Sequence, residues 1–346
     1  MRTAHKLVRR VTLLLDNADV RSVLRMRDCV EALRASFADL AAGDAVDRPR
    51  SHTYTDLGAG RHYLFKSMDG ALPRLGVHAL RVSSDLTHEH DGRRDKVAAA
   101  PGERYVGLVV LFDQATLVPL AVLHDGYLQR MRVGATSALA ADLLARRDSR
   151  VAAVIGAGWQ AGAQIEGLRA VRRLDEVRVY GPTRAKVEAL CAEHGATPVA
   201  SPRDAIAGAD VVALATNAHV PVLDGEWLEE GQHVGSIQVR EVDARTLERA
   251  DLVVRRSDVQ PTFHFAQGHR PVEAGDVAQP EAITLAEVVA GRAGRVSPGQ
   301  ITLFTGGSAG LGTQFAAVAH AVFHAAREAG VGRELPTEWF TQEEKP

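Results

Sequence analysis

The chain has 346 residues, of which 46% are hydrophobic and 24% are charged, the proportions of an ordinary soluble globular protein. Lys and Arg number 41 against 43 Asp and Glu, a formal net charge of −2, so no electrostatic argument favours a nucleic acid or an anionic membrane surface as partner. Two cysteines, Cys29 and Cys191, stand in no paired motif, which argues against a disulfide framework and fits a reducing cytoplasm. No run approaches the roughly 20 apolar residues of a membrane span, and we expect no signal peptide.

The N-terminal part of the chain mixes strand and helix patterns. Hydrophobic residues at helical spacing predict a long helix that ends at Gly43, and Asp19 is expected to cap a short helix before it. A charged stretch with histidines, Thr87–Pro101, is interpreted as a loop. We therefore expect an α+β region with a strand at Val11–Leu15, a helix at Met26–Ala42, and strands around Tyr63–Phe65, Val77–Val82 and Tyr105–Phe112.

After this region, short apolar strands alternate with helices, as in a doubly wound parallel sheet. The series begins with an alanine-rich helix, and a long helix follows the Gly/Ser stretch Gly306–Gly312. The predicted fold class is α/β, a Rossmann doubly wound parallel sheet domain plus a second, α+β domain. Its expected elements are helix Val133–Ala145, strand Val151–Ile155, helix Ala161–Ala170, strand Val177–Tyr180, helix Thr183–Glu193, strands Asp210–Thr216, His233–Ile237, Leu252–Val254 and Ile301–Phe304, and a final helix to Ala329.

A glycine turn of the form G-x-G-x-x-A follows the first of these strands. The first glycine permits the tight turn, the second lets the backbone approach a pyrophosphate, and the final alanine allows close packing of helix on strand. The N-terminus of the next helix favours an anion, so we expect a nicotinamide dinucleotide here. The predicted contacts are Gly156, Ala157, Gly158, Trp159 and Gln160.

The end of the second strand indicates which dinucleotide is bound. An acid for the ribose 2′-hydroxyl of NAD usually stands there, but the chain continues from Tyr180 without one. Thr183, Arg184 and Lys186 are instead suited to a 2′-phosphate. We therefore favour NADP(H) as cofactor, with NAD(H) as the alternative.

Other motifs give weaker signals. The run from His88 to Asp91 stands in a charged stretch without a partner cluster, so no metal site is predicted. Ser137 has no His/Asp arrangement that would make it a nucleophile. Gly306–Gly310 is interpreted as a flexible turn near the nicotinamide or as a plain linker, and Trp227 and Trp339 as packing residues.

Several of these segments together resemble the ornithine cyclodeaminase/mu-crystallin family, which includes ketimine reductases and an archaeal-type alanine dehydrogenase. The resemblance covers nearly the whole chain and implies a homodimer and a split substrate-binding and dimerisation domain. That domain would comprise residues 1–128 and 317–346, around a Rossmann domain at 129–316. The matching segments are Asp19–Gly43, Pro49-Arg50, Gly107–Asp113, Arg132–Ala140, Gly156–Ala161, Ala215–Asn217, Arg240–Asp243 and Ile301–Phe304.

The resemblance implies that two arginines, Arg50 and Arg132, grip a substrate α-carboxylate. Guanidinium groups suit this role because they bind carboxylates in a bidentate manner. We expect further cofactor contacts along the Rossmann part of the chain, at Thr216, Asn217, Ser236, Ile237 and Gly310.

The sequence departs from the family pattern at its catalytic groups. Either His78 or Arg81 stands in place of the family's active-site lysine, strand spacing favours Arg81, and Lys66 lies just upstream as another ammonium group. Arginine stays protonated and is a poor proton shuttle. The stretch that bears the cyclodeaminase aspartate is missing before Arg240, and Phe315 stands where the family often has an acid.

Three functions remain open, and the first is favoured. It is an NADP(H)-dependent reductase of an imine or 2-oxo acid derivative with an α-carboxylate, in which Lys66, Arg81 or His78 polarises or protonates the reacting nitrogen. The second is an ornithine or lysine cyclodeaminase with bound NAD. The third is a dinucleotide-binding protein without turnover. In each case the ligand is a small amino-acid-like molecule and the protein is expected to be cytoplasmic.

Overall fold

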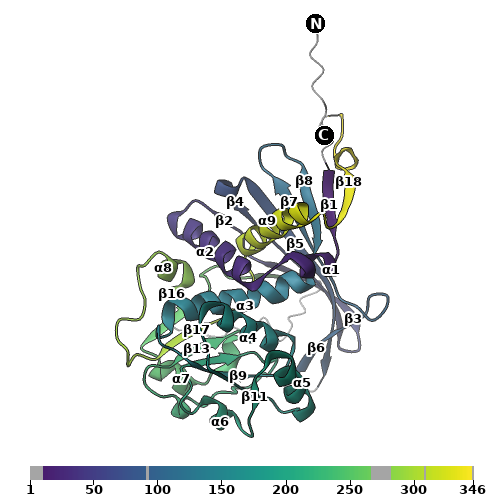
Figure 1. Ribbon diagram of the computed structural model, residues 1–346. Coiled ribbons are helices and arrows are strands. Elements are labelled where there is room, and N and C mark those ends of the chain that lie inside the picture. The colour runs from purple at the N-terminus through teal and green to yellow at the C-terminus, as the bar shows by residue number, and fades with distance from the viewer. Residues whose placement is uncertain (1–10, 91–92, 266–281, 308, 345–346) are drawn as a thin grey trace.

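The computed structural model describes residues 11–90, 93–265, 282–307 and 309–344. Two β-sheets occupy the upper and lower parts of the molecule, and helix α3 (Asp125–Leu144) lies between them (Figure 1). Each sheet carries helices, so the molecule is built from layers that bury apolar faces against one another.

The upper sheet has ten strands among the described residues and is largely antiparallel. Strand β18, near the C-terminus, pairs antiparallel with β1, which in turn pairs in parallel with β8. Both ends of the described chain therefore belong to one sheet. In spatial order the strands are β15 (Thr262–Phe265), β3 (Ser51–Gly58), β4 (Arg61–Leu72), β5 (Val77–His90), β7 (Val106–Asp113), β8 (Pro119–His124), β1 (Val11–Leu15) and β18 (Arg333–Pro336), while β2 (Val46–Asp47) pairs with β4 and β6 (Arg93–Val97) with β5.

Helices α1 (Asn17–Val23) and α9 (Gly312–Ala329) pack on one face of this sheet, and α2 (Met26–Ala42) packs against α9 and α3. Leu33 and Phe37 of α2 and Phe315 of α9 are fully buried in the resulting core. Helix α9 begins very close to β4, because a Cβ atom on Gly312 would lie 2.0 Å from the carbonyl of Asp69. The start of α9 is thereby fixed against the strand.

Two expectations for this region were wrong in detail. The segment expected as a charged loop is mostly an antiparallel hairpin of β5 and β6, in which Leu86 pairs with Val97. Its inward residues are polar, so the apolar alternation that marks a strand is absent from the sequence. The first short helix is capped by Asp16, whose side chain accepts from the Asp19 amide, while Asp19 completes the capping box.

The lower sheet is parallel throughout, and the prediction of a Rossmann fold is confirmed. Strand β9 lies between β10 and β12, so the chain runs outward from β9 in one direction and then in the other. Open α/β sheets bind their ligands at such a switch point. In spatial order the strands are β11 (Thr197–Pro198), β10 (Glu176–Tyr180), β9 (Val151–Ile155), β12 (Val211–Leu214), β13 (His233–Ser236), β17 (Thr302–Thr305), β14 (Leu252–Arg255) and β16 (Ile283–Thr284).

Two apolar layers cover the faces of the lower sheet. On one face, side chains of the sheet pack against α3, α4 (Trp159–Val171) and α5 (Arg184–His194). On the other face, they pack against α6 (Pro202–Ile206) and the segments around Leu223 and Leu228. Helices α7 (Ala244–Arg249) and α8 (Leu285–Val289) complete the set in the described chain. Trp227 packs against the second layer as expected, but Trp339 is 70% exposed and does not pack as predicted.

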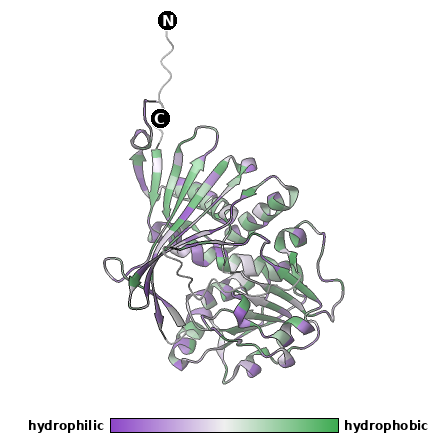
Figure 2. Cartoon of the chain, turned by 180° about the vertical axis from the view of Figure 1, so that it is seen from behind, coloured by the Kyte–Doolittle hydropathy of each residue, from purple (hydrophilic) through white to green (hydrophobic). Residues whose placement is uncertain are grey.

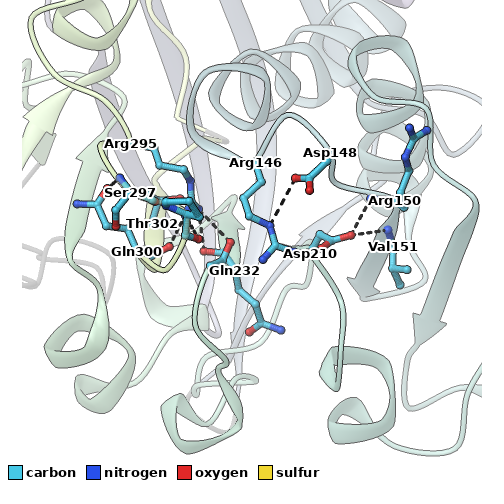
Figure 3. Close-up of polar contacts among 12 residues, drawn as sticks. Arg146, Asp148, Arg150, Val151, Asp210, Gln232, Arg295, Ser297, Gln300 and Thr302 are labelled. Carbon is cyan, nitrogen blue, oxygen red and sulfur yellow. Dashed lines mark hydrogen bonds and ion pairs between the residues drawn. The ribbon is translucent and has the colours of Figure 1, made fainter.

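The amino ends of the parallel strands are held by polar contacts (Figure 3). Asp210, directly before β12, accepts from the backbone amides of Arg150 and Val151 and pairs with Arg146. Arg295 donates to the carbonyl oxygens of neighbouring segments, among them that of Gly231 at 3.1 Å. This end of the sheet is therefore closed by the chain itself.

Helix α3 begins eight positions earlier than predicted, at Asp125 rather than Val133. The His124 ring accepts a hydrogen bond from the Gly126 amide at 3.0 Å and caps the helix. The added turns carry buried charged residues, Arg130 and Arg132 among them, so their pattern does not look apolar in the sequence. These turns project toward the space between the two sheets.

Candidate functional site

A pocket of about 1270 Å³ opens between the two sheets. It brings together the inner face of β3, β4 and β5, the start of α3, and the segments that follow β13, β14 and β17. Of the residues predicted for the site, those that line this pocket are Arg50, Lys66, Arg81, Arg132, Trp159, Ile237 and Gly310.

Strand register explains why the polar residues of the upper sheet share one face. Lys66 pairs with Ser83 and with His52, and Arg81 pairs with Met68. Side chains alternate between the faces of a strand, so all of these point toward the pocket. The same alternation places His78 on the opposite face of β5, where it lies 3.2 Å from Asp69 and does not line the pocket. His78 therefore lies on the other side of the sheet from Lys66 and Arg81.

Arg81 is fixed by an ion pair that the sequence analysis missed. Its guanidinium lies 2.5 Å from the carboxylate of Asp125, the first residue of α3, and both side chains are buried. Gly107 on β7 makes room for this carboxylate, since a Cβ atom there would lie 2.0 Å from Asp125 Oδ1. Arg81 therefore presents a positioned, permanently charged fork to the pocket.

Arg132 is fully buried at the same end of the pocket. It donates from Nε to Gln129 at 3.1 Å and from Nη1 to the carbonyl of Gly307 at 3.2 Å. Burial lowers the pKa of Arg132 well below its ordinary value, and the nearby charges of Arg81, Arg256 and Arg50 lower it further. An anion bound beside Arg132 would relieve this repulsion.

The ring of Phe315 lies between two of these arginines. The Cζ atoms of Arg81 and Arg132 are each 5.4 Å from its centroid, a cation–π arrangement. An acid at this position would have neutralised part of the cluster. Phe315 orients both guanidinium groups and leaves their charge in place.

Arg256 is a second residue that the sequence analysis missed. It lies just after β14 and lines the pocket. Its Nε atom is buried without a hydrogen-bond partner in the described structure, and its Nη1 is 3.4 Å from the carbonyl of Gly310. Burial and the charge of Arg50 lower the pKa of Arg256 to about 10, against the opposing effect of Asp47.

Lys66 belongs to a separate cluster on the upper sheet. Its ammonium lies 3.7 Å from the buried carboxylate of Asp85, which also pairs with Lys96 at 2.6 Å and accepts from Ser83 at 3.1 Å. Asp85 thus holds Lys66 at the wall of the pocket. Lysine, unlike arginine, can exchange its proton.

The glycine turn has the geometry that a dinucleotide needs. Gly156 has φ +122°, and a Cβ atom there would lie 2.3 Å from the carbonyl of Ala215. A Cβ atom on Gly158 would meet nothing within 4 Å, and α4 begins there without a side-chain cap. Backbone and helix N-terminus are thus open to a pyrophosphate beside Trp159 and Gln160, and the residues fit the expected cofactor.

Glu241 organises the segments after β12 and β13. Its buried carboxylate accepts from the amide and hydroxyl of Thr216, at 2.6 and 2.9 Å, and from the hydroxyl of Ser236 at 2.9 Å. Burial raises the pKa of Glu241, although these hydrogen bonds oppose the effect. The hydroxyls of Thr216 and Ser236, expected to contact the cofactor, are therefore engaged by Glu241, while Asn217 is exposed.

The residues predicted for a 2′-phosphate follow β10 at the edge of the lower sheet. Thr183 precedes α5 and makes no side-chain cap. Arg184 is exposed and pairs with Glu188, one turn along α5, at 2.6 Å. Arg184 is thus accessible, with an intrahelical partner that a phosphate would have to displace.

Some functional signals were absent from the sequence because they depend on pairing between distant segments. Asp125, Asp85 and Arg256 stand in no motif, and only the structure brings them to one pocket. Part of the His88–Asp91 run lies outside the described residues; within those that are described, no three potential metal ligands come together. Likewise, no helix in the described ranges is both long and apolar enough to cross a membrane.

Comparisons with known proteins identify the family of the chain. The model of the ornithine cyclodeaminase/mu-crystallin family matches residues 10–330. The chain is 30% identical to an alanine dehydrogenase of Archaeoglobus fulgidus over 94% of this chain and 98% of that protein. Its structure is similar to that of Thermococcus litoralis Δ1-pyrroline-2-carboxylate reductase in complex with NADH and L-proline, with a TM-score of 0.76, 27% identity and coverage of 94% and 100%. It is also similar to an archaeal alanine dehydrogenase dimer with bound NAD, with a TM-score of 0.74, 28% identity and coverage of 94% and 99%.

Proposed function

The chain belongs to the ornithine cyclodeaminase/mu-crystallin family, and from this premise we propose that it is an NADP(H)-dependent reductase of small imines that carry an α-carboxylate. An NAD(P)-dependent reductase or a cyclodeaminase-like enzyme follows from the family and its relatives. The finer proposal rests on one observation. The arginine cluster lines the same pocket as Trp159, the first residue of the helix that follows the glycine turn.

In the proposed reaction, Arg50 and Arg132 bind the substrate carboxylate, because two guanidinium groups from different elements fix both its position and its plane. Arg81, held by Asp125, adds a third positive charge next to them. Bound NAD(P)H would supply a hydride to the carbon of the C=N bond. Lys66, anchored by Asp85, donates a proton to the nitrogen.

Cofactor choice forms a separate part of the proposal. Thr183, Arg184 and Lys186 follow β10 where an acid would select NAD. Two cationic side chains there favour the 2′-phosphate of NADP(H). The relatives named above include NADH and NAD complexes, so NAD(H) is the alternative to be tested.

A cyclodeaminase is the less favoured function. The chain passes directly from β13, through Ile237 and Val239, to Arg240, without an acid in this segment. Ornithine cyclisation needs a group that accepts and returns protons at the second amine. Among the described lining residues, Asp85 and Asp125 are the carboxylates, and both are paired with cations.

The test is a turnover assay with the purified chain. NADPH oxidation is measured with cyclic ketimines, and with 2-oxo acids plus ammonia or methylamine. We expect NADPH consumption that depends on the carboxylate and an amino-acid product. Ammonia release from ornithine or lysine without net cofactor consumption would instead establish a cyclodeaminase. Tight dinucleotide binding with no turnover on either panel would establish a binding protein.

We also propose a homodimer formed through the uncovered face of the upper sheet. Tyr63, Phe65, Val97 and Leu108 are 37–38% exposed on adjacent strands of that face. Many residues of these strands are hydrophobic in Figure 2, and exposed apolar side chains gathered on one face favour an interface. Light scattering after gel filtration should give twice the 37.1 kDa of the chain.

We further propose that the chain has two domains. Residues 1–128 and 317–346 form the substrate-binding and dimerisation domain, and residues 129–316 form the Rossmann domain.

A further inference from the structure

Two histidines on helix α9 form a pair that the proposed reaction does not use. His320 and His324 are one helical turn apart, and their Nε2 atoms lie 3.0 Å from each other. Residues four apart are neighbours on one side of a helix, and neither histidine lines the pocket between the two sheets. We infer that this pair is a binding site for a divalent transition-metal ion, with Cu²⁺ or Ni²⁺ as the best fit.

The distance between the two nitrogens fits two neighbouring positions around one metal ion. Imidazole nitrogens bind such an ion at about 2.0–2.1 Å. Two bonds of this length at a right angle hold the nitrogens about 2.9 Å apart, whereas a tetrahedral angle holds them about 3.3 Å apart. The separation of 3.0 Å is closer to the right angle. Right angles are the geometry that Cu²⁺ and Ni²⁺ adopt with nitrogen ligands.

The contact between the two rings also suits an exchange of a proton for a metal ion. The rings meet at 61° with their centroids 4.4 Å apart, and without an ion one Nε2 atom donates a proton to the other. A metal ion takes the place of this proton and accepts the lone pair of each Nε2, while each Nδ1 carries a hydrogen. Burial, with a smaller effect of the charge on His324, lowers the pKa of His320. This ring is therefore neutral at neutral pH, as a metal ligand must be.

The backbone that carries the two histidines is held in place by the core. Val322 and Phe323, which stand between them, are buried, and so is Ala326. The helix ends in a left-handed cap at Gly330, whose amide donates to the carbonyl of Ala326. Two ligands on a fixed helix lose little freedom when an ion binds, which favours binding.

The pair is accessible from solvent. His324 is exposed and His320 is half-buried. Helix α9 packs on one face of the upper sheet, and the homodimer proposed above uses the other face, so dimerisation leaves the pair open. In the ranges that the structure describes, no third potential ligand joins the two. Water would therefore occupy the remaining positions of the ion, and we expect an open site of modest affinity.

The experiment measures binding of Cu²⁺ and Ni²⁺ to the full chain by calorimetry, and the ligands of Cu²⁺ by electron paramagnetic resonance. We expect a site for one ion per chain, with two imidazole nitrogens in the spectrum. His320→Gln and His324→Gln should each weaken binding at this site by about tenfold or more, because one of two linked ligands is lost. Ni²⁺ should also raise the melting temperature of the unchanged chain more than that of either variant.

The matched control keeps both rings and changes only their spacing. A chain that combines His324→Ala with Ala325→His has the same number of histidines, but the second ring is turned about 140° around the helix from the first. This chain, folded by circular dichroism, should lose the site as the single variants do. His78→Gln removes a histidine that lies beside Asp69 instead and should keep the site. Equal affinity in His320→Gln or in the respaced chain, or no binding of either ion at about 1 mM, would overturn the inference.

Discussion

The two ends of the parallel sheet use arginine in opposite ways. At the amino end, Arg295 donates to the carbonyls of Leu144, Gly231 and Gln232 and to the hydroxyl of Thr302, and Arg146 pairs with Asp210 (Figure 3). At the carboxyl end, the pocket brings arginines together with fewer carboxylates than cations. The first arrangement is complete within the chain, whereas the second has the charge to receive an anion.

The arginines at the amino end are therefore expected to stabilise the fold, and those at the carboxyl end to bind a ligand. A guanidinium whose donors are all engaged by the protein stabilises the fold. Like charges gathered in a buried pocket destabilise it, and proteins retain such clusters where a ligand uses them. Substitutions at the two ends should therefore have different consequences, which the following experiments test.

The largest effect is expected from Arg132→Met. This change removes the buried guanidinium proposed to hold the α-carboxylate and should lower kcat/KM by about 1,000-fold. The free energy of unfolding should stay unchanged or rise, because the substitution also removes repulsion from Arg81, Arg256 and Arg50. Steady-state kinetics and urea denaturation measure the two quantities. Loss of stability with full activity would contradict the distinction.

Arg295→Met should show the opposite pattern. It removes several hydrogen bonds to backbone carbonyls at the amino end and should lower the free energy of unfolding by about 3 kcal/mol. Because Arg295 lies at the other end of the sheet from the pocket, kcat/KM should change by less than about twofold at a temperature where the variant is folded. A larger change in kcat/KM would show that the two ends are coupled.

His233 provides a pH test of the amino end. Burial, with smaller effects of Arg295 and Arg172, lowers the pKa of His233 to about 3. The unfolded chain, where histidine titrates near 6.5, binds more protons between these values, so stability falls as the pH decreases through this window. The contribution approaches about 1.4 kcal/mol per pH unit. In His233→Asn, which can keep a hydrogen bond to Thr302, denaturation curves from pH 7 to pH 4 should show a weaker dependence; equal slopes would contradict this.

The sequence anticipated the lower sheet better than the pocket. The strand before Gly156, the turn and the helix after it are local features, and the structure has them where they were predicted. The hairpin of β5 and β6 and the first turns of α3 were missed because their inward side chains are polar. Arg256 had no local signal, since its role depends on a strand crossing to pair with β3.

A smaller effect is expected at the cofactor edge. NADPH should bind more tightly than NADH, and Arg184→Ala should reduce this preference by about tenfold, because one charge-assisted contact to the 2′-phosphate is lost. NADH affinity should stay within about twofold and serves as the internal control. Fluorescence titration measures both dissociation constants. Tighter binding of NADH by the unchanged protein would contradict the proposed preference.

The central claim, reduction of a carboxylate-bearing C=N bond, is tested most directly by isotope transfer. The purified chain is incubated with cyclic ketimine carboxylates, or with 2-oxo acids and ammonia, and with NADPH deuterated at C4 of the nicotinamide, separately for each face of the ring. We predict that one of the two labels is transferred to C2 of the amino-acid product, as seen by NMR. Absence of deuterium at C2 with both labels, together with ammonia release from ornithine and an unchanged cofactor pool, would contradict it.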